Sequence, residues 1–181
     1  MRIISGKYGG RKIHPPAKMP YTRPTTDVAK EGLFNIIENN TSIPGMKTLD
    51  VFGGTGSITY ELASRGAASL TIVEKDAKMY EFIRKSVNEL NIENCSVIKM
   101  DVFRFLENTA EKFDLIFAGP PYALKEIDQL PGIIRNKKLL NDNGWFILEH
   151  TPANNYEKES MFKSMRNYGT TQFSIFINKN N

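Results

Sequence analysis

A glycine-rich turn, Asp50-Val51-Phe52-Gly53-Gly54-Thr55-Gly56, follows a short apolar run and precedes a helical pattern. Glycine lets the backbone turn sharply and approach a ligand closely, where any Cβ atom would obstruct it. A turn of this kind between a strand and a helix predicts a nucleotide site, but it suits NAD, FAD and phosphate groups as well. Neighbouring residues must therefore identify the ligand.

These neighbours favour S-adenosylmethionine. Thr59 occupies the third glycine position of the dinucleotide fingerprint G-x-G-x-x-G, and the chain has no G-K-[ST] phosphate loop. Asp50, at the end of the preceding strand, would repel a pyrophosphate and attract the cationic sulfonium and ammonium groups of S-adenosylmethionine. We therefore expect this cofactor rather than a dinucleotide.

Two further acids end the next two predicted strands. Glu74, 18 residues after Gly56, is placed to accept hydrogen bonds from both ribose hydroxyls, and Asp101 could receive the adenine amine. Each acid has an alternative role, because carboxylates often cap helices, and Asp76 and Asp101 could both do so. Three acids at one sheet edge together favour the cofactor site. The expected cofactor contacts are Asp50, Phe52, Gly53, Gly54, Gly56, Glu74, Lys75, Asp101 and Val102.

A second loop, Gly119-Pro120-Pro121-Tyr122, follows a later strand and should lie at the same sheet edge. Proline has no N–H, so this rigid loop offers carbonyl acceptors, which suit an amine. Hydrogen bonds from the two protons of an exocyclic base amine would aim its lone pair at the methyl group. Tyr122 could stack on the extruded base. We predict that these four residues form the catalytic loop; the alternative is a Pro-Pro turn with a buried tyrosine.

Basic residues gather at the start of the chain. Residues 1–30 hold seven Lys and Arg and one acid, whereas the rest of the chain holds 17 basic and 19 acidic residues. This arm favours contact with the phosphates of RNA, although it could be only a solvated tail. The predicted RNA contacts are Arg2, Lys7, Arg11, Lys12, Arg23 and Thr25.

The elements that must position these residues are predicted strands and helices, which alternate from Lys47 onward. Two final runs are separated only by a turn at Gly169, which predicts an antiparallel hairpin. The fold class is therefore α/β: a Rossmann-like class I S-adenosylmethionine-dependent methyltransferase with a mostly parallel seven-stranded sheet ending in that hairpin. The expected strands are 48–52, 69–73, 96–99, 114–118, 145–149, 161–168 and 171–178, and the expected helices are 57–64, 77–90, 102–107 and 127–140.

The N-terminal segment precedes these alternating strands and helices. Residues 2–5 and 11–13 flank Gly9-Gly10, which predicts a small β-hairpin, and residues 14–24 hold four prolines, as in a linker. Thr25, Thr26 and Asp27 could cap a helix that ends near Asn39-Asn40. We therefore divide the chain into an arm and linker (1–24) and a methyltransferase domain (25–181).

The bulk composition of the 181 residues, with 40% hydrophobic and 24% charged residues, is ordinary for one globular domain. The sequence contains neither a spanning-length apolar run nor an apolar signal-peptide core, so we expect a cytoplasmic protein with no membrane partner. We also expect a monomer. A single cysteine, Cys95, cannot form an internal disulfide or a zinc cluster, so we expect no metal and a buried Cys95. His14 and His150 are interpreted as structural.

The motifs resemble those of bacterial 16S rRNA (guanine-N2)-methyltransferases of the RsmD type over nearly the whole chain. The resemblance rests on residues 1–11, 23–27, 30–35, 49–56, 64–67, 113–117 and 120–122. It implies N2 methylation of one guanine in 16S rRNA, in an assembled small-subunit particle, with S-adenosylmethionine as the methyl donor. The opening and the R-P-T-T-D segment are specific to the family, whereas many methyltransferases share the glycine turn.

One position departs from the family pattern. The family has Asp or Asn before Pro-Pro, and here that residue is Gly119. Loss of a positioned acceptor commonly costs on the order of a hundredfold in rate, and Asp114 is expected to be too distant to substitute. A bound water, a variant mechanism and an impaired protein that binds RNA and retains cofactor remain alternatives. Methylation of an adenine amine in DNA is disfavoured, because no separate base-recognition domain is evident.

Overall fold

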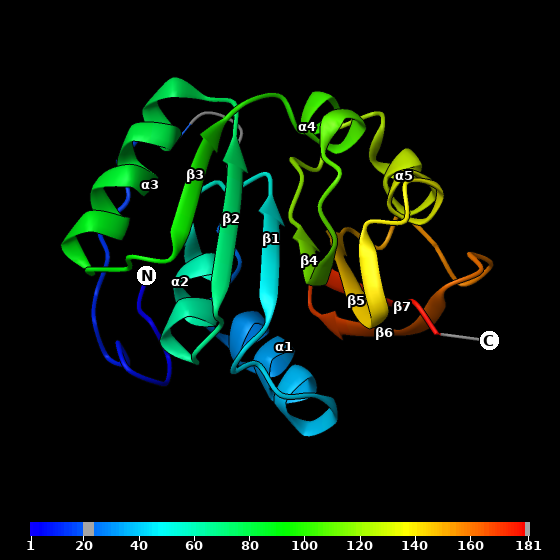
Figure 1. Cartoon of the computed structure of the whole chain (residues 1–181), viewed down its shortest axis with the longest axis horizontal. Helices are drawn as coiled ribbons and strands as arrows, with labels where there is room; N and C mark the ends of the chain where they lie inside the picture. The colour runs from blue at the N-terminus through cyan, green and yellow to red at the C-terminus, as the bar shows by residue number, and fades with distance from the viewer. Residues whose placement is uncertain (20–23, 180–181) are drawn as a thin grey trace.

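The computed structural model describes residues 1–19 and 24–179, in which seven strands form one sheet in the order β3-β2-β1-β4-β5-β7-β6 (Figure 1). The strands are β1 (Lys47–Val51), β2 (Ser69–Glu74), β3 (Cys95–Lys99), β4 (Phe113–Ala118), β5 (Leu140–His150), β6 (Phe162–Tyr168) and β7 (Thr171–Ile177). The helices are α1 (Asp27–Asn40), α2 (Ser57–Ser64), α3 (Ala77–Glu89), α4 (Val102–Asn108), the 3₁₀ turn η1 (Ile127–Gln129) and α5 (Leu130–Asn136).

The pairing of the strands confirms the predicted fold class. β1 to β5 pair in parallel, and β7 pairs antiparallel with both β5 and β6. The central strands read as apolar runs because helices cover both of their faces. The carboxyl ends of β1, β2, β4 and β5 consequently share one edge of the sheet, where open α/β sheets bind ligands.

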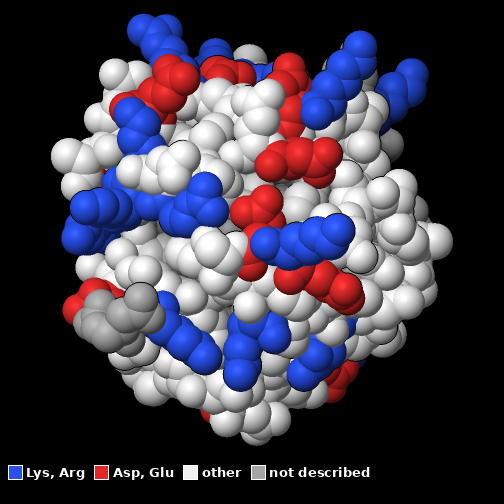
Figure 2. Space-filling model, turned by 90° about the vertical axis from the view of Figure 1, so that its right-hand side faces the viewer, with Lys and Arg blue, Asp and Glu red and all other residues white. Residues whose placement is uncertain are grey.

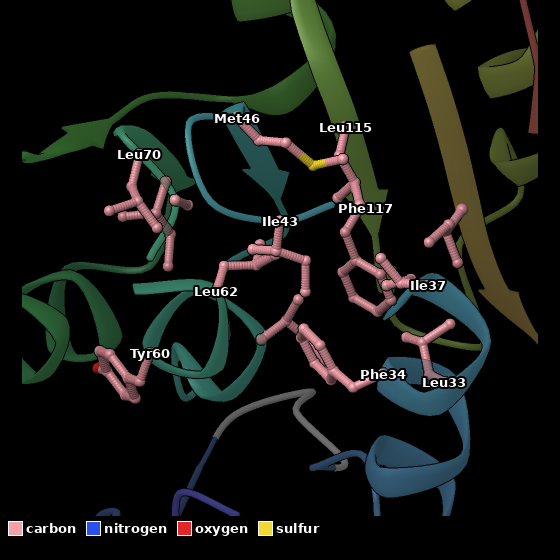
Figure 3. Packing of buried hydrophobic residues seen from close by; sticks show 14 of the residues in the cluster. Leu33, Phe34, Ile37, Ile43, Met46, Tyr60, Leu62, Leu70, Leu115 and Phe117 are labelled. Carbon is pink, nitrogen blue, oxygen red and sulfur yellow. The ribbon is translucent and has the colours of Figure 1, made fainter. Parts of the chain in front are cut away.

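Two apolar clusters fill the space between the sheet and the helices. Side chains from α1, α2 and α3 pack on one face, and side chains from α4 and α5 pack on the other. Figure 3 shows the first cluster, in which Phe34 of α1 and Leu62 of α2 lie near Phe117 of β4. Phe34 and Leu62 are fully buried and Phe117 nearly so, and burial of this kind is the main contribution to the stability of the sheet edge that carries the site.

Side-chain caps fix where three helices begin. Thr26 accepts a hydrogen bond from Ala29 N (3.2 Å) at the start of α1, and Asp76 accepts one from Met79 N (2.9 Å) at the start of α3. Asp101 does the same for Arg104 N (3.2 Å) in α4. These bonds satisfy backbone N–H groups that have no partner within the helix.

The predicted helix over 127–140 is shorter in the structure. α5 ends at Asn136, Lys138 adopts a left-handed φ of 54°, and β5 already begins at Leu140. Buried Leu139 and Leu140 extend the apolar pattern past the helix end, which is why the sequence indicated a longer helix. Cys95 is only partly buried, at the start of β3, rather than fully buried as expected.

The N-terminal arm, residues 1–13, is tied to the body of the fold. Its hairpin is reduced to one antiparallel bridge between Arg2 and Lys12, with a bond from Ile3 N to Arg11 O (3.0 Å). Ile3 is buried in the first apolar cluster, as are Tyr8 and Ile13. Apolar side chains therefore help to order the arm, while Arg2, Lys7, Arg11 and Lys12 remain exposed.

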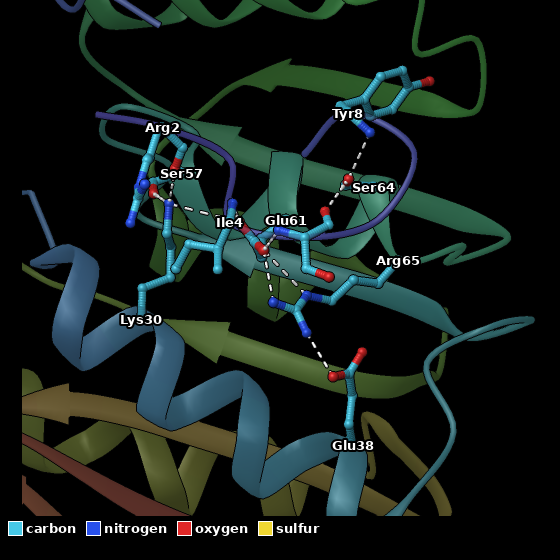
Figure 4. Close-up of polar contacts among 10 residues, drawn as sticks. Arg2, Ile4, Tyr8, Lys30, Glu38, Ser57, Glu61, Ser64 and Arg65 are labelled. Carbon is cyan, nitrogen blue, oxygen red and sulfur yellow. Dashed lines mark hydrogen bonds and ion pairs between the residues drawn. The ribbon is translucent and has the colours of Figure 1, made fainter. Parts of the chain in front are cut away.

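A buried ionic cluster completes this attachment (Figure 4). Glu61 of α2 accepts hydrogen bonds from Ile4 N (2.9 Å) and Ser5 N (3.1 Å) and pairs with Lys30 Nζ at 3.7 Å and with Arg65 Nη2 at 2.8 Å. Burial lowers the pKa of Lys30, while the charge of Glu61 opposes that shift. Arm, α1 and α2 thus share one desolvated set of charges.

Candidate active site

A cavity of about 410 Å³ opens at the carboxyl edge of the sheet. This volume lies in the range of small-molecule sites. Both predicted loops line it, so the tertiary structure brings the glycine turn and the Pro-Pro loop together. The sequence-predicted residues in its wall are Thr25, Asp50, Phe52, Gly53, Gly54, Glu74, Lys75, Val102, Gly119, Pro120, Pro121 and Tyr122.

Glu74 and the glycine turn hold each other in place. Oε2 of Glu74 accepts a hydrogen bond from Gly54 N (2.8 Å), and Oε1 accepts one from Asp76 N (2.8 Å). A carboxylate has about four lone-pair sites, so these two bonds are compatible with further hydroxyl donors in the cavity. Gly54 and Gly56 have φ angles of 57° and 77°, a conformation that glycine adopts without strain.

Two of the glycines are required by close packing in the protein interior. A Cβ atom on Gly53 would lie 2.8 Å from Cγ1 of Ile72 and 3.1 Å from Cδ1 of Ile83. A Cβ atom on Gly56 would lie 2.4 Å from the ring of Tyr60, and Gly56 is outside the cavity wall. Close packing of the turn on β2, α2 and α3 therefore favours glycine at these two positions, whatever the cavity binds.

Asp50 is a buried carboxyl group at the end of β1, 3% exposed, in the cavity wall. Burial raises its pKa to about 8, the nearby charges of Glu74 and Glu149 act in the same direction, and the hydrogen bond from Thr59 opposes them. A cation in the cavity would favour the ionised form. The acidic side of the cavity therefore suits a positively charged ligand.

The Pro-Pro loop forms another part of the cavity wall. Tyr122 Oη donates to Glu149 Oε1 (3.3 Å) and lies 3.3 Å from Thr171 Oγ1. Asp114 is at the other end of β4, where its carboxylate accepts from Lys47 N (2.8 Å) and Asn141 Nδ2 (2.9 Å), and it is not in the cavity wall. Asp114 therefore does not replace the side chain that Gly119 lacks.

Glu149 is an acidic residue of the cavity wall that was not among the predicted site residues. It is the penultimate residue of β5, is 4% exposed, lines the cavity and accepts a 2.6 Å hydrogen bond from Thr25 Oγ1. Thr25, predicted to contact RNA, thus directs its hydroxyl at a carboxylate in the cavity wall. The signal was present in the sequence, because Glu149 is an acid near the carboxyl end of a predicted strand, as are Asp50 and Glu74.

Other predicted residues lie away from the cavity. Asp101 is exposed and caps α4, and it is not in the cavity wall. Lys7 and Arg11 lie over the ring of Tyr8, 5.2 Å and 5.5 Å from its centre, and Arg2 lies 3.6 Å from Asp27. Arg11 and Lys12 also line a second hollow together with His14, Lys85 and Glu89. Arg23 falls outside the described residues.

Basic and acidic side chains are not separated from each other on every face of the molecule. On the face seen from the right-hand side of Figure 1, where α5 and the C-terminal strands lie, basic and acidic side chains are interspersed (Figure 2). Large fields of one sign attract polyanions more strongly than mixed charge does. The described part of the basic arm, with Arg2, Lys7, Arg11 and Lys12 all exposed, therefore remains the better candidate for phosphate contacts.

His150 has a structural role, as expected. Its Nε2 lies 2.7 Å from Ser174 Oγ, its Nδ1 lies 2.8 Å from Thr151 O, and its ring packs edge-on against Tyr156. Burial lowers its pKa. Within residues 1–19 and 24–179, no group of three His, Cys, Asp or Glu side chains could hold a metal ion, and no helix is long and apolar enough to cross a membrane.

This strand order, with a glycine turn after β1 and acids at the ends of β1 and β2, defines the class I fold of S-adenosylmethionine-dependent methyltransferases. The solved structure of the Escherichia coli protein yhhF is similar at a TM-score of 0.86 and 24% identity, covering 100% of this chain and 99% of that one. A hypothetical protein of Thermus thermophilus is similar at a TM-score of 0.85 and 25% identity, covering 97% and 98%.

The sequence comparisons narrow this class to one family. The family model described as Conserved hypothetical protein 95 matches residues 1–177. Ribosomal RNA small subunit methyltransferase D of Buchnera aphidicola (subsp. Baizongia pistaciae) is 31% identical over 100% of this chain and 93% of its own length, and that of Escherichia coli K12 is 32% identical over 80% and 69%. The chain belongs to this family of RsmD-type proteins, which confirms the resemblance found in its motifs.

Proposed function

We propose that this protein transfers a methyl group from S-adenosylmethionine to the exocyclic N2 amine of a guanine in 16S rRNA, with the small ribosomal subunit particle as substrate. The observation that carries the proposal is the shared cavity, which joins an acidic cofactor side to a loop of hydrogen-bond acceptors. The names of the family relatives, ribosomal RNA small subunit methyltransferases, support ribosomal RNA as the target. The cytoplasmic location, the monomeric state and the absence of a metal stay predictions.

S-adenosylmethionine would supply an electrophilic methyl group on a cationic sulfur. The residues of the cavity fit this cofactor, because Glu74 is held facing the cavity by Gly54 N and Asp76 N and can accept hydrogen bonds from ribose hydroxyls. Asp50 would offer a negative charge to the cationic end. The cavity wall also includes Phe52, Lys75 and Val102, and we propose contacts from all three.

The Pro-Pro loop would bind the base. Its carbonyl groups can accept an amine proton, because Pro120 and Pro121 carry no N–H that would compete. The ring of Tyr122 would stack on the extruded base, and its hydroxyl is anchored to Glu149. The described arm residues Arg2, Lys7, Arg11 and Lys12 would contact RNA phosphates outside the cavity, and we extend this proposal to Arg23.

The test is methylation of small ribosomal particles that lack base methylation. Recombinant protein and S-adenosylmethionine are incubated with these particles, and the digested RNA is analysed as nucleosides by mass spectrometry. We expect N2-methylguanosine. N6-methyladenosine would indicate the adenine alternative. Tight binding of cofactor and RNA in calorimetry without any product would instead identify a non-catalytic RNA-binding protein. The proposal fails if only a Gly119→Asp variant methylates the particles.

A further inference from the structure

We infer that Glu149 supplies, from β5, the acceptor carboxylate that Gly119 cannot supply from β4, and that it binds the amine to be methylated. This inference rests on the proposed function and assigns Glu149 as a catalytic residue. It also assigns Thr25 as the positioning residue that holds Glu149. The protein would then be competent although its Pro-Pro loop lacks the usual side-chain acceptor.

The strand register places the two positions side by side. β4 and β5 are parallel, and Ala118 is paired with Leu148, so Gly119 and Glu149 follow as the next neighbours along the two strands. A Cβ atom on Gly119 would lie 3.7 Å from Glu149 Oε2. The carboxylate of an aspartate lies one bond beyond its Cβ atom, so Glu149 brings its oxygen to the region that an aspartate at position 119 would reach.

The carboxylate of Glu149 is held rather than mobile. Thr25 Oγ1 donates to Oε2 (2.6 Å) and Tyr122 Oη donates to Oε1 (3.3 Å), and the residue is 4% exposed. Desolvated carboxylates persist in proteins when hydrogen bonds of this kind satisfy them. The same two donors also tie Glu149 to the N-terminal segment and to the catalytic loop. An acceptor fixed in advance needs little reorganisation during the reaction, which is the condition for effective electrostatic catalysis.

The chemistry follows from this position. One amine proton would be donated to Glu149 and the other to a carbonyl of the Pro-Pro loop, which turns the nitrogen lone pair toward the methyl carbon. The N–C bond forms as the C–S bond breaks, and the electron pair of that bond stays on sulfur. The cationic nitrogen then gives one proton to Glu149, which passes it to water. The carboxylate thus stabilises the positive charge that develops on nitrogen.

A binding experiment tests Glu149 without turnover. Protein loaded with S-adenosylhomocysteine is titrated by NMR with guanosine 5′-monophosphate and with inosine 5′-monophosphate, which lacks the exocyclic amine. We expect the wild type to prefer the guanosine nucleotide about tenfold, as one charge-assisted hydrogen bond allows. Glu149→Gln should reduce this preference to about twofold or less. A wild type that does not distinguish the two nucleotides would overturn the inference, as would an unchanged preference in Glu149→Gln.

Rescue separates this role from a structural one. We expect Glu149→Gln to lower kcat roughly hundredfold. A second change in this variant, Gly119→Asp, should restore the nucleotide preference and raise kcat by at least about tenfold. Gly119→Asp alone should bring no gain, because two carboxylates would compete for one place. A gain of about tenfold in kcat for Gly119→Asp alone would contradict the inference, as would a double variant that is no better than Glu149→Gln.

Two further variants control for folding. Asp128→Asn is the matched carboxylate-to-amide change, because Asp128 also accepts from a tyrosine, Tyr156 Oη (2.8 Å), but lies outside the cavity wall. It should leave the nucleotide preference and kcat unchanged. Thr25→Val keeps Glu149 but removes the hydroxyl that donates a hydrogen bond to its carboxylate. The preference for the guanosine nucleotide should therefore fall although the carboxylate remains. If Glu149→Gln does not fold, an unaltered preference in Thr25→Val refutes the positioning step.

The proposed function and the role of Glu149 can be refuted independently of each other. If the wild type methylates a base other than guanine, the proposed function is wrong. The comparison of the two nucleotides needs no methyl transfer, so it still decides whether Glu149 recognises the amine.

Discussion

Thr59 Oγ1 lies 2.8 Å from Asp50 Oδ2, and this hydroxyl donates the hydrogen bond that stabilises the charged form of a buried carboxyl group. The bond joins the first turn of α2 to the end of β1. It only partly offsets burial, which raises the pKa of Asp50 to about 8. The charge of the cavity near neutral pH therefore depends on what the cavity binds.

Cofactor affinity should rise with pH. A cationic ligand favours ionised Asp50, whose pKa of about 8 in the free protein means that binding below this pH must release a proton. Affinity for S-adenosylmethionine should therefore increase by up to roughly tenfold per pH unit from about pH 6 to about pH 7.5. Calorimetry in two buffers of different ionisation enthalpy measures both the affinity and the released proton. Asp50→Asn should bind the cofactor more weakly, and its affinity should not rise with pH in this way. An equal rise of affinity with pH in Asp50→Asn would contradict the prediction.

The buried Glu61 should dominate the docking of the N-terminal arm. Glu61→Gln leaves Lys30 and Arg65 desolvated without their shared partner, which should lower the free energy of unfolding by about 3 to 5 kcal/mol. Trypsin should then cleave the arm after Lys7 or Arg11 much faster than in the wild type. The measurements are urea denaturation and timed proteolysis followed by mass spectrometry.

Glu38→Gln is the control for Glu61, because Glu38 also pairs with Arg65 but its side chain is 44% exposed. Its loss should cost no more than about 1 kcal/mol and leave the arm protected. Equal destabilisation by the two variants would contradict the dominant role of Glu61 in holding the arm.

Removal of charge from the arm should weaken RNA binding but not cofactor binding. Changing Arg2, Lys7, Arg11 and Lys12 together to serine should lower RNA affinity and reduce the slope of log affinity against log salt, by roughly 0.7 to 0.9 for each phosphate that the protein no longer neutralises. Cofactor affinity should remain, because these four side chains lie outside the cavity wall. Filter binding at several salt concentrations measures the slope. The matched control changes the exposed Lys137, Lys138, Lys158 and Lys163 to serine; an equal loss there would refute a specific role of the arm.

Gly53→Ala should destabilise the protein although it adds only one methyl group. The new Cβ atom would lie 2.8 Å from Ile72 Cγ1, inside a packed core, so we expect a loss of about 1 to 3 kcal/mol and weaker cofactor binding. Gly132→Ala is the control, because Gly132 lies within α5 and its Cβ atom would meet nothing within 4 Å. It should raise stability by about 0.5 to 1 kcal/mol. Similar denaturation midpoints for the two variants would contradict this packing argument.

The local signals in the sequence located most elements well. The bounds of α2 agree with the structure, and α1 and α3 begin at the caps that Thr26 and Asp76 indicated, because capping depends on residues only a few positions apart. The end of α5 was misjudged, since apolar Leu139 and Leu140 fit a helix or a strand equally well. Only the pairing of Leu140 with Phe113 decides for the strand.

The sequence by itself determined the fold class, the family, the glycine turn and the Pro-Pro loop, because these depend on local patterns and short motifs. It also showed that Gly119 lacks a side-chain acceptor. Only the tertiary structure decided what lies beside that gap: parallel pairing of β4 with β5 brings Glu149, 30 positions further along the chain, within reach of Gly119. The position of Glu149 near the end of a predicted strand could have marked it as a site candidate. Its proximity to Gly119 could not be predicted, because strand register is a long-range property that the spacing of residues along the chain does not reveal.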